Sequence, residues 1–199
     1  MPANINYSDL IQRVISAESM QEQSIDIEFS LPDYCPEIEK ILKEEKPTQM
    51  LTTLGVFSES EINSRYEILL DSYSKTIQVE ACTALKIAKN QIFPACLSYL
   101  NKITQTANNL AVINANFDFI KEDVLELSNL LTVMKKRIKD LELAIENVKA
   151  KKADNLEKAK LWKDKVLSLM NDLREVVDTL ETKVDEKDWP MPTYIDLLF

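Results

Sequence analysis

The strongest candidates for metal-binding or catalytic residues are five carboxylates: Glu80, Glu122, Asp123, Glu126 and Asp164. Inward-facing glutamates bind pairs of iron ions in some helical bundles, but they do so together with Glu-x-x-His motifs. The chain has no histidine, so the usual general base and the commonest metal ligand are both missing. We therefore interpret these carboxylates as solvated side chains on helix surfaces, and we expect no catalytic residue, no bound metal and no cofactor.

The three cysteines are Cys35, Cys82 and Cys96. An odd number at such wide spacings fits neither a disulfide framework nor a zinc site. Cys82 and Cys96 lie on apolar helical stretches, where a free thiol packs as a small hydrophobe. The first residues show no secretory leader, and no apolar run approaches the length of a membrane span. We expect reduced thiols in a cytoplasmic protein that has no membrane partner.

Two short basic runs, KKRIK at 135–139 and KAKK at 149–152, are the remaining candidates for a binding patch. They alternate with Asp140, Glu142 and Glu146, as helix-surface ion pairs do. The net charge of −9 leaves little basic surface for phosphate groups. We interpret both runs as ordinary helix surface and expect no nucleic-acid partner.

The elements that position any site must be helices. A single glycine, Gly55, in 199 residues argues against a sheet over most of the chain, because hairpins and tight strand connections depend on left-handed turns. The hydrophobic content of 45% is enough for a folded core.

The first 47 or so residues have a different pattern from the rest. Apolar residues at helical spacing predict a short helix within 7–20, and alternation from Ile25 to Leu31 predicts a strand. Pro32 and Pro36 then frame a turn, and a short helix should follow and end before Pro47.

A long helix should begin at Ser58, which stands three residues before Glu61 in a capping-box spacing. Pro94 should bend this helix without ending it. The polar run TQTANN, 104–109, is the predicted connection to the next helix. The apolar stripe comprises Ile62, Tyr66, Leu69, Tyr73, Ile77, Ala81, Leu85, Ala88, Ile92, Tyr99 and Ile103.

Two more stripes follow, on either side of the turn KKADN at 151–155. The second alternates four- and three-residue steps without a break, which is the repeat that holds an apolar seam against a partner helix: Ile113, Phe117, Ile120, Val124, Leu127, Leu131, Met134, Ile138, Leu141, Ile145 and Val148. The third comprises Leu156, Trp162, Val166, Leu169, Leu173, Val177, Leu180 and Val184. The fold class is therefore predicted to be all-α, a long antiparallel helical hairpin or three-helix coiled-coil bundle, with a small N-terminal helix-strand-turn segment.

The final residues WPMPTYIDLLF, 189–199, combine two prolines with a cluster of large apolar side chains. Pro190 and Pro192 forbid a helix here. We interpret this stretch as an extended docking tail that either covers its own bundle or reaches a neighbour. The candidate interaction residues are Trp189, Tyr194, Leu197, Leu198 and Phe199.

Two stretches resemble a known family. The run FSESEINSRYEILLDSYSKTIQVEA, 57–81, resembles the start of the C-terminal helical domain of type III glutamine synthetases, and DWPMPTYIDLLF, 188–199, is similar to their terminus. The resemblance covers about residues 50–199. It implies a helical fold that belongs to a large ring-shaped oligomer, whereas the family's catalytic region, with its histidine ligands and ATP pocket, has no counterpart in this chain.

A third stretch, SIDIEFSLPDYCPEIEKILK at 24–43, resembles the opening of the SPOCS domain of spore-coat and spore-morphogenesis proteins. The resemblance covers only about 35 residues, whereas a whole SPOCS domain is longer and rich in strands. A natural fusion, a gene remnant and an engineered chimera all remain open as origins of the joint.

The sequence thus predicts a SPOCS-like segment at 1–49, a long-helix bundle at 50–188 and a docking tail at 189–199. The preferred function is that of a non-catalytic helical interaction or assembly protein, which associates with itself or with a full-length glutamine synthetase. Two alternatives stay open: a spore-envelope protein tethered through the SPOCS-like segment, and a fragment that completes a glutamine synthetase in trans.

Overall fold

The computed structural model describes residue 43 and residues 45–192. The chain divides into two units, Met1–Ser30 and Leu31–Phe199, and every described residue belongs to the second. The predicted N-terminal helix and strand lie outside the described residues.

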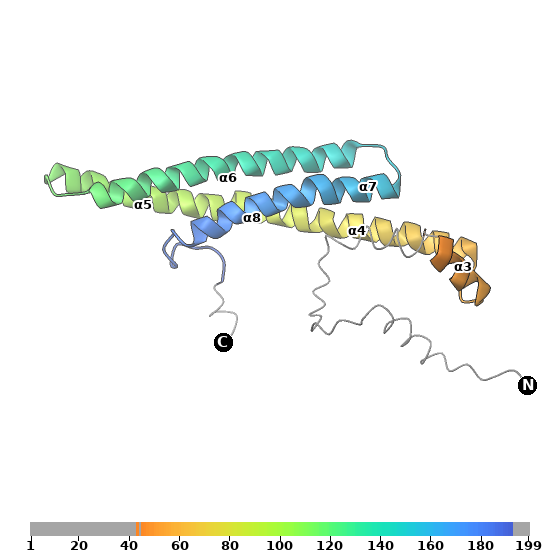
Figure 1. Ribbon diagram of the computed structural model, residues 1–199. Helices are drawn as coiled ribbons and strands as arrows, with labels where there is room; N and C mark the ends of the chain where they lie inside the picture. The colour runs from red at the N-terminus through yellow and green to blue at the C-terminus, as the bar shows by residue number, and fades with distance from the viewer. Residues whose placement is uncertain (1–42, 44, 193–199) are drawn as a thin grey trace, which may run out of the picture. The chain divides into compact units, whose positions relative to one another are not determined.

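Helices account for the regular structure of the described part, which contains no strand, and this confirms the predicted all-α class. Three rods pack along one another (Figure 1). The first rod is continuous from α4 to α5, the second is α6, and the third runs from α7 to α8. The elements are α3 (Glu45–Thr53), α4 (Glu59–Ile87), the π-helical turn η1 (Ala88–Ile92), α5 (Phe93–Val112), α6 (Asp118–Ala150), α7 (Asn155–Leu161), the π-helical turn η2 (Trp162–Leu167) and α8 (Ser168–Glu181).

The start of α4 is the predicted capping box. The Ser58 hydroxyl accepts a hydrogen bond from the Glu61 backbone N–H at 3.3 Å, and the Glu61 carboxylate accepts one from the Ser58 N–H at 2.8 Å. Two otherwise unpaired amides are thereby satisfied. The preceding helix α3 ends at a turn in which Gly55 adopts φ 66°, a left-handed conformation that favours glycine.

Neither Pro94 nor Pro47 ends a helix. The chain stays helical through Pro94, as predicted, and the departure from α-helical bonding falls at η1, where the Phe93 N–H reaches back to the Ala88 carbonyl. Pro47 was predicted to follow a helix, and this prediction was wrong. It lies within α3.

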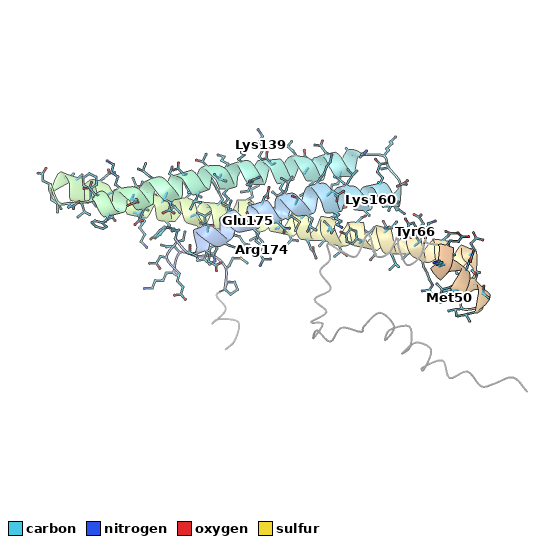
Figure 2. All side chains as sticks on the ribbon, in the orientation of Figure 1. Met50, Tyr66, Lys139, Lys160, Arg174 and Glu175 are labelled. Atoms are coloured by element: carbon cyan, nitrogen blue, oxygen red, sulfur yellow. The ribbon has the colours of Figure 1, made fainter. Side chains whose placement is uncertain are left out.

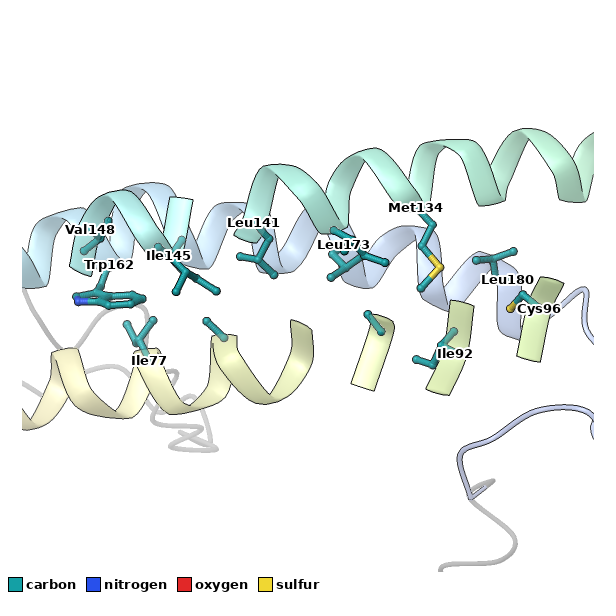
Figure 3. Close-up of a cluster of buried hydrophobic side chains, with 14 of the residues drawn as sticks. Ile77, Ile92, Cys96, Met134, Leu141, Ile145, Val148, Trp162, Leu173 and Leu180 are labelled. Carbon is teal, nitrogen blue, oxygen red and sulfur yellow. The ribbon is translucent and has the colours of Figure 1, made fainter. Parts of the chain in front are cut away.

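The core lies along the line where the three rods meet. Side chains from α4, η1, α5, α6 and the third rod point toward one another, with Trp162 between the first rod and α6 (Figure 3). The buried residues of α6 are Leu127, Leu131, Met134, Ile138, Leu141, Ile145 and Val148, all of them members of the predicted stripe. Burying such side chains stabilises the bundle by roughly 1.5–3 kcal/mol each.

The connection between the first and second rods is displaced from its predicted place. The run TQTANN is helical and belongs to α5, which continues to Val112. The turn lies at 113–117 instead, where Asn114 adopts φ 54° and Ile113 is 70% exposed. Ile113 is therefore not part of a buried seam.

Candidate functional site

The five candidate carboxylates are not gathered into one site. Glu80 lies on α4 and Asp164 in η2, whereas Glu122, Asp123 and Glu126 lie near the start of α6. Glu126 accepts a hydrogen bond from Lys183 at 2.9 Å. This carboxylate, followed by Asp123 and Glu122, raises the pKa of Lys183. Within the part of the chain that the structure describes, no three Cys, Asp or Glu side chains are placed to hold a metal ion.

Two of the cysteines lie on the first rod. Cys96 is fully buried, and burial raises the pKa of its thiol to about 11. Cys82 is half-buried, and its sulfur accepts a hydrogen bond from the Lys149 ammonium at 3.4 Å. Cys35 lies outside the described residues.

The basic runs of α6 are divided among different neighbours and form no single patch. Arg137 pairs with Asp172 of α8 at 2.7 Å, and Lys151 pairs with Glu157 of α7. Lys139, in contrast, extends from the side of α6 that faces away from α8 (Figure 2). These pairs agree with the interpretation of ordinary helix surface.

The segment that follows α8 folds back on the bundle. The Trp189 backbone N–H donates to the Asp185 carbonyl at 3.1 Å, and Asp188 accepts a hydrogen bond from Lys102 of α5 at 3.0 Å. Trp189 is 9% exposed and belongs to the core cluster, while its buried Nε1 has no hydrogen-bond partner among the described residues. The other predicted tail residues, Tyr194, Leu197, Leu198 and Phe199, lie outside the described residues.

A groove of about 330 Å³ opens where α8 ends, and we call it the end groove. Apolar and charged side chains both line it. The lining residues are Tyr99, Ile103, Phe119, Ile120, Asp123, Glu126, Leu127, Thr182 and Lys183.

The end groove is lined in part by the hairpin tip, which we define as residues 103–120: the last part of α5, the turn and the first residues of α6. Three of its large apolar side chains are exposed: Val112 (80%), Ile113 (70%) and Phe119 (63%). The tip was not among the predicted site residues. A sequence signal for it exists, however, because residues 103–117 carry no charged side chain although 29% of the chain is charged. None of the described helices is long and apolar enough to span a membrane.

Part of this helical unit is similar in sequence to a known protein family. Residues 30–111 match the model of the family described as "Glutamine synthetase C-terminal domain". The chain is therefore similar to the C-terminal domain of glutamine synthetases. The match begins at residue 30, so it includes most of the segment 24–43 in which we noted a SPOCS-like motif. The SPOCS resemblance and the boundary at residue 49 stay predictions.

Several glutamine synthetases are similar in sequence to most of this chain. A glutamine synthetase of Bacteroides fragilis (strain YCH46) is 28% identical over 150 residues, 72% of this chain and 20% of that protein. A type-3 glutamine synthetase of Dictyostelium discoideum is 28% identical over 176 residues, 82% of this chain and 23% of that protein. A glutamine synthetase of Butyrivibrio fibrisolvens is 29% identical over 154 residues, 75% of this chain and 22% of that protein. The chain thus spans about a fifth of the length of the curated relatives it matches.

Proposed function

We propose that this helical unit is a non-catalytic assembly element, which makes protein–protein contacts with a second copy of itself or with a type-3 glutamine synthetase. The observation that carries the proposal is the hairpin tip. Val112 and Ile113 are exposed within the uncharged run 103–117, and Phe119 is exposed two residues beyond it, after Asp118. Exposed apolar surface depleted of charged residues is typical of the centre of an interface.

The similarity to glutamine synthetases supports an assembly role more than a chemical one. The matching family model is that of a C-terminal domain, and the full-length relatives are about five times as long as this chain. The carboxylates of the helical unit are dispersed over three rods, and the thiol of Cys96 is buried with a raised pKa. Among the described residues, this dispersal and burial support a contact role over acid–base or nucleophilic chemistry.

The tail is proposed as a second contact element. Trp189 already packs in the bundle's own core, and Asp188 is held by Lys102. Residues 194–199 would extend this docking on the same bundle or reach a neighbouring chain, and both routes bury large apolar side chains at roughly 1.5–3 kcal/mol each. Deleting residues 193–199 distinguishes the two routes. A lower melting temperature with an unchanged oligomeric state in solution indicates docking on the same bundle, whereas a smaller oligomer indicates docking on a neighbouring chain.

The assembly role is tested by sedimentation velocity of the chain alone and mixed with a type-3 glutamine synthetase. We expect a faster-sedimenting species in at least one of the two samples. A chain that stays monomeric alone at high concentration, and that leaves the sedimentation of the synthetase unchanged, would refute the proposal.

A fragment that completes a glutamine synthetase in trans is the second candidate, favoured by the fact that the relatives are named as whole enzymes. Glutamine synthetase activity measured with and without the chain distinguishes the two. Our proposal expects no turnover by the chain alone and no restored activity in a synthetase that lacks its C-terminal domain. The spore-envelope role rests on the SPOCS-like segment, most of which lies outside the described residues, and stays a prediction.

A further inference from the structure

The third rod, which runs from α7 to α8, carries its charges in two blocks. Its first half, 155–167, has four lysines and two acidic residues, and its second half, 168–181, has four acidic residues and one arginine. Acidic side chains stabilise a helix near its N-terminus and basic side chains near its C-terminus, but the last turn of α8 holds Asp178 and Glu181. The stability of the rod alone therefore does not explain the order of its charges.

The outward face of this rod, which we call the third-rod face, repeats one spacing. Each half contributes residues at i, i+3, i+4 and i+7, a spacing that gathers side chains on one side of a helix. Lys160 lies toward one end of the rod, and Arg174 and Glu175 lie toward the other (Figure 2). Six of the eight residues are exposed and two, Lys163 and Leu167, are half-buried. The face comprises Lys160, Lys163, Asp164 and Leu167 in the first half and Asn171, Arg174, Glu175 and Asp178 in the second.

The third-rod face is complementary in charge to its own reverse. When a second copy lies antiparallel to the first about an axis near Leu169, each charged residue of the face meets a residue of opposite charge, and Leu167 meets Asn171. A parallel copy would instead set each charge against its own kind. The complementary pairs, each formed twice, are Lys160 with Asp178, Lys163 with Glu175 and Asp164 with Arg174.

Two acidic chains can meet on this face because its charges nearly balance. The whole chain has a net charge of −9, but residues 155–181 hold five basic and six acidic side chains. At physiological salt the Debye length is about 8 Å, so charges elsewhere on the bundle are largely screened, while opposite charges in contact attract. Arg174 and Asp178 lie 3.6 Å apart within α8, but they are 78% and 60% exposed, so exchanging this pair for one between copies costs little.

The order of the charges also selects the partner. A strongly acidic partner would be repelled by α8, and a strongly basic one by the lysines of 158–165. Within the rod this register opposes one like-charged pair, Glu157 and Glu181, at the two ends, where Lys151 already pairs with Glu157. A second copy supplies the required order of charges, because a two-fold contact sets the same surface against itself.

We infer that the third-rod face pairs with the third-rod face of a second copy of this chain. The two rods lie side by side and antiparallel about a two-fold axis near Leu169, so the contact is closed and joins two copies. The negative half of each rod then lies against the positive half of the other, and the two helix dipoles run in opposite directions. The inference rests on the proposed assembly role, names a second copy as the partner, and uses a surface outside the hairpin tip.

Because the contact is built on exposed charges, it should be weak and sensitive to salt. The rod rises only about 40 Å from 155 to 181, and exposed ion pairs are individually weak. We expect a Kd on the order of 100 µM at about 0.15 M salt. Raising the salt to about 0.5 M should weaken pairing at least about threefold, whereas association through the uncharged run 103–117 should not weaken.

Charge reversal tests the pairing, measured by sedimentation velocity of the full chain. Lys160→Glu/Lys163→Glu makes the face mostly acidic, and Glu175→Lys/Asp178→Lys makes it mostly basic. Each variant alone should pair at least about tenfold more weakly than the parent. An equal mixture of the two should pair again, and so should the variant with all four substitutions, because both restore opposite charges. The hairpin tip is the same in every sample, so association through it cannot produce this pattern.

The matched control is Lys136→Glu/Lys139→Glu, which changes the net charge by the same amount at two exposed lysines of α6 and should pair as the parent does. Equal weakening in this control, or no recovery in the mixture and in the fourfold variant, would overturn the inference. If every variant associates as the parent does, the contact lies elsewhere; that result would overturn the inference and leave the proposed function standing. A parent chain that neither self-associates nor binds a type-3 glutamine synthetase would overturn both.

Disulfide trapping tests the antiparallel orientation. Ser168 and Glu181 are exposed residues of α8, the first beside the two-fold axis and the second at the end of the rod. In an antiparallel pair the two copies of residue 181 lie roughly 36 Å apart along the rods, beyond the reach of a disulfide. Under mild oxidation, Ser168→Cys should give more covalent dimer than the parent, and Glu181→Cys should not. Trapping through residue 181, or no gain through residue 168, would overturn the antiparallel pairing.

Discussion

Lys102 on α5 donates a 3.0 Å hydrogen bond to Asp188, 86 positions further along the chain. This hydrogen bond to the Asp188 carboxylate raises the pKa of Lys102. The pair holds the turn after α8 against the first rod. Trp189, the next residue in the chain, lies in the core. Because the Lys102 side chain is 63% exposed, solvent screens the attraction, and burial of the indole should dominate the stability of this turn.

Trp189→Ala should therefore lower the free energy of unfolding by about 3 kcal/mol, since it removes a large buried aromatic side chain. Asp188→Asn, which breaks only the exposed ion pair, should cost less than about 1 kcal/mol. Urea unfolding followed by circular dichroism measures both. Equal effects of the two substitutions would show that the ion pair, and not the indole, holds the turn.

Leu127→Asp should be severely destabilising, by about 3 kcal/mol or more, because Leu127 is 3% exposed and an aspartate there would bury an unpaired carboxylate. Leu125, two residues earlier on α6, is 58% exposed and provides the control. Leu125→Asp should leave the melting temperature of the monomer nearly unchanged. A mild effect at residue 127 would mean that this stretch of α6 is not buried.

The capping box should confer a measurable pH dependence. Hydrogen bonds from the Ser58 backbone and then the Ser58 side chain lower the pKa of Glu61 below its ordinary value of 4.5. A depressed pKa stabilises the fold above pH 4.5, and this contribution is lost as pH falls through the folded-state pKa. We expect Glu61→Gln to flatten the fall in stability below pH 4.5 relative to the parent, and Ser58→Ala to cost about 1 kcal/mol near neutrality. Identical acid profiles of parent and Glu61→Gln would refute the capping role.

Cys96 should resist alkylation in the folded protein. Its thiol has a pKa of about 11 against an ordinary 9.0, so at pH 8 both burial and protonation protect it. Because the unfolded chain loses this proton first, the contribution of Cys96 to stability should decline as pH rises above 9.0. Iodoacetamide labelling followed by peptide mass spectrometry should modify Cys82 well before Cys96. Rapid labelling of Cys96 at pH 8 without unfolding would contradict the packing described here.

The accuracy of the sequence-based predictions follows from what each residue pattern encodes. Every buried residue of α6 falls on the predicted stripe, because burial imposes a period of three and four residues. The Ser58–Glu61 cap was also predictable, since its chemistry is local. The end of α5 was not predictable, because the polar residues of TQTANN are tolerated on an exposed helix. The Thr104 hydroxyl donates a hydrogen bond to the Leu100 carbonyl at 2.7 Å. The turn depends instead on a left-handed Asn114.

The candidate site was less predictable than the fold. The tail was identified by its apolar residues, and the structure places Trp189 in the core. The hairpin tip was missed because Ile113 was assigned to the buried seam; the structure instead places Val112 and Ile113 next to each other at a helix end, where both are exposed. The two π-helical turns also have no simple sequence signature; the second begins at Trp162, whose buried side chain belongs to the core.

Association of this unit through the hairpin tip, which contains the uncharged run 103–117, is tested most directly by hydrogen–deuterium exchange at low and at high protein concentration. The amides of 103–120 should exchange more slowly at high concentration, with no comparable change at 150–160 at the other end of α6. In Val112→Glu/Ile113→Glu that added protection should disappear. Protection that does not change at the tip with concentration or on addition of a type-3 glutamine synthetase, or that rises at 150–160 instead, would contradict the claim.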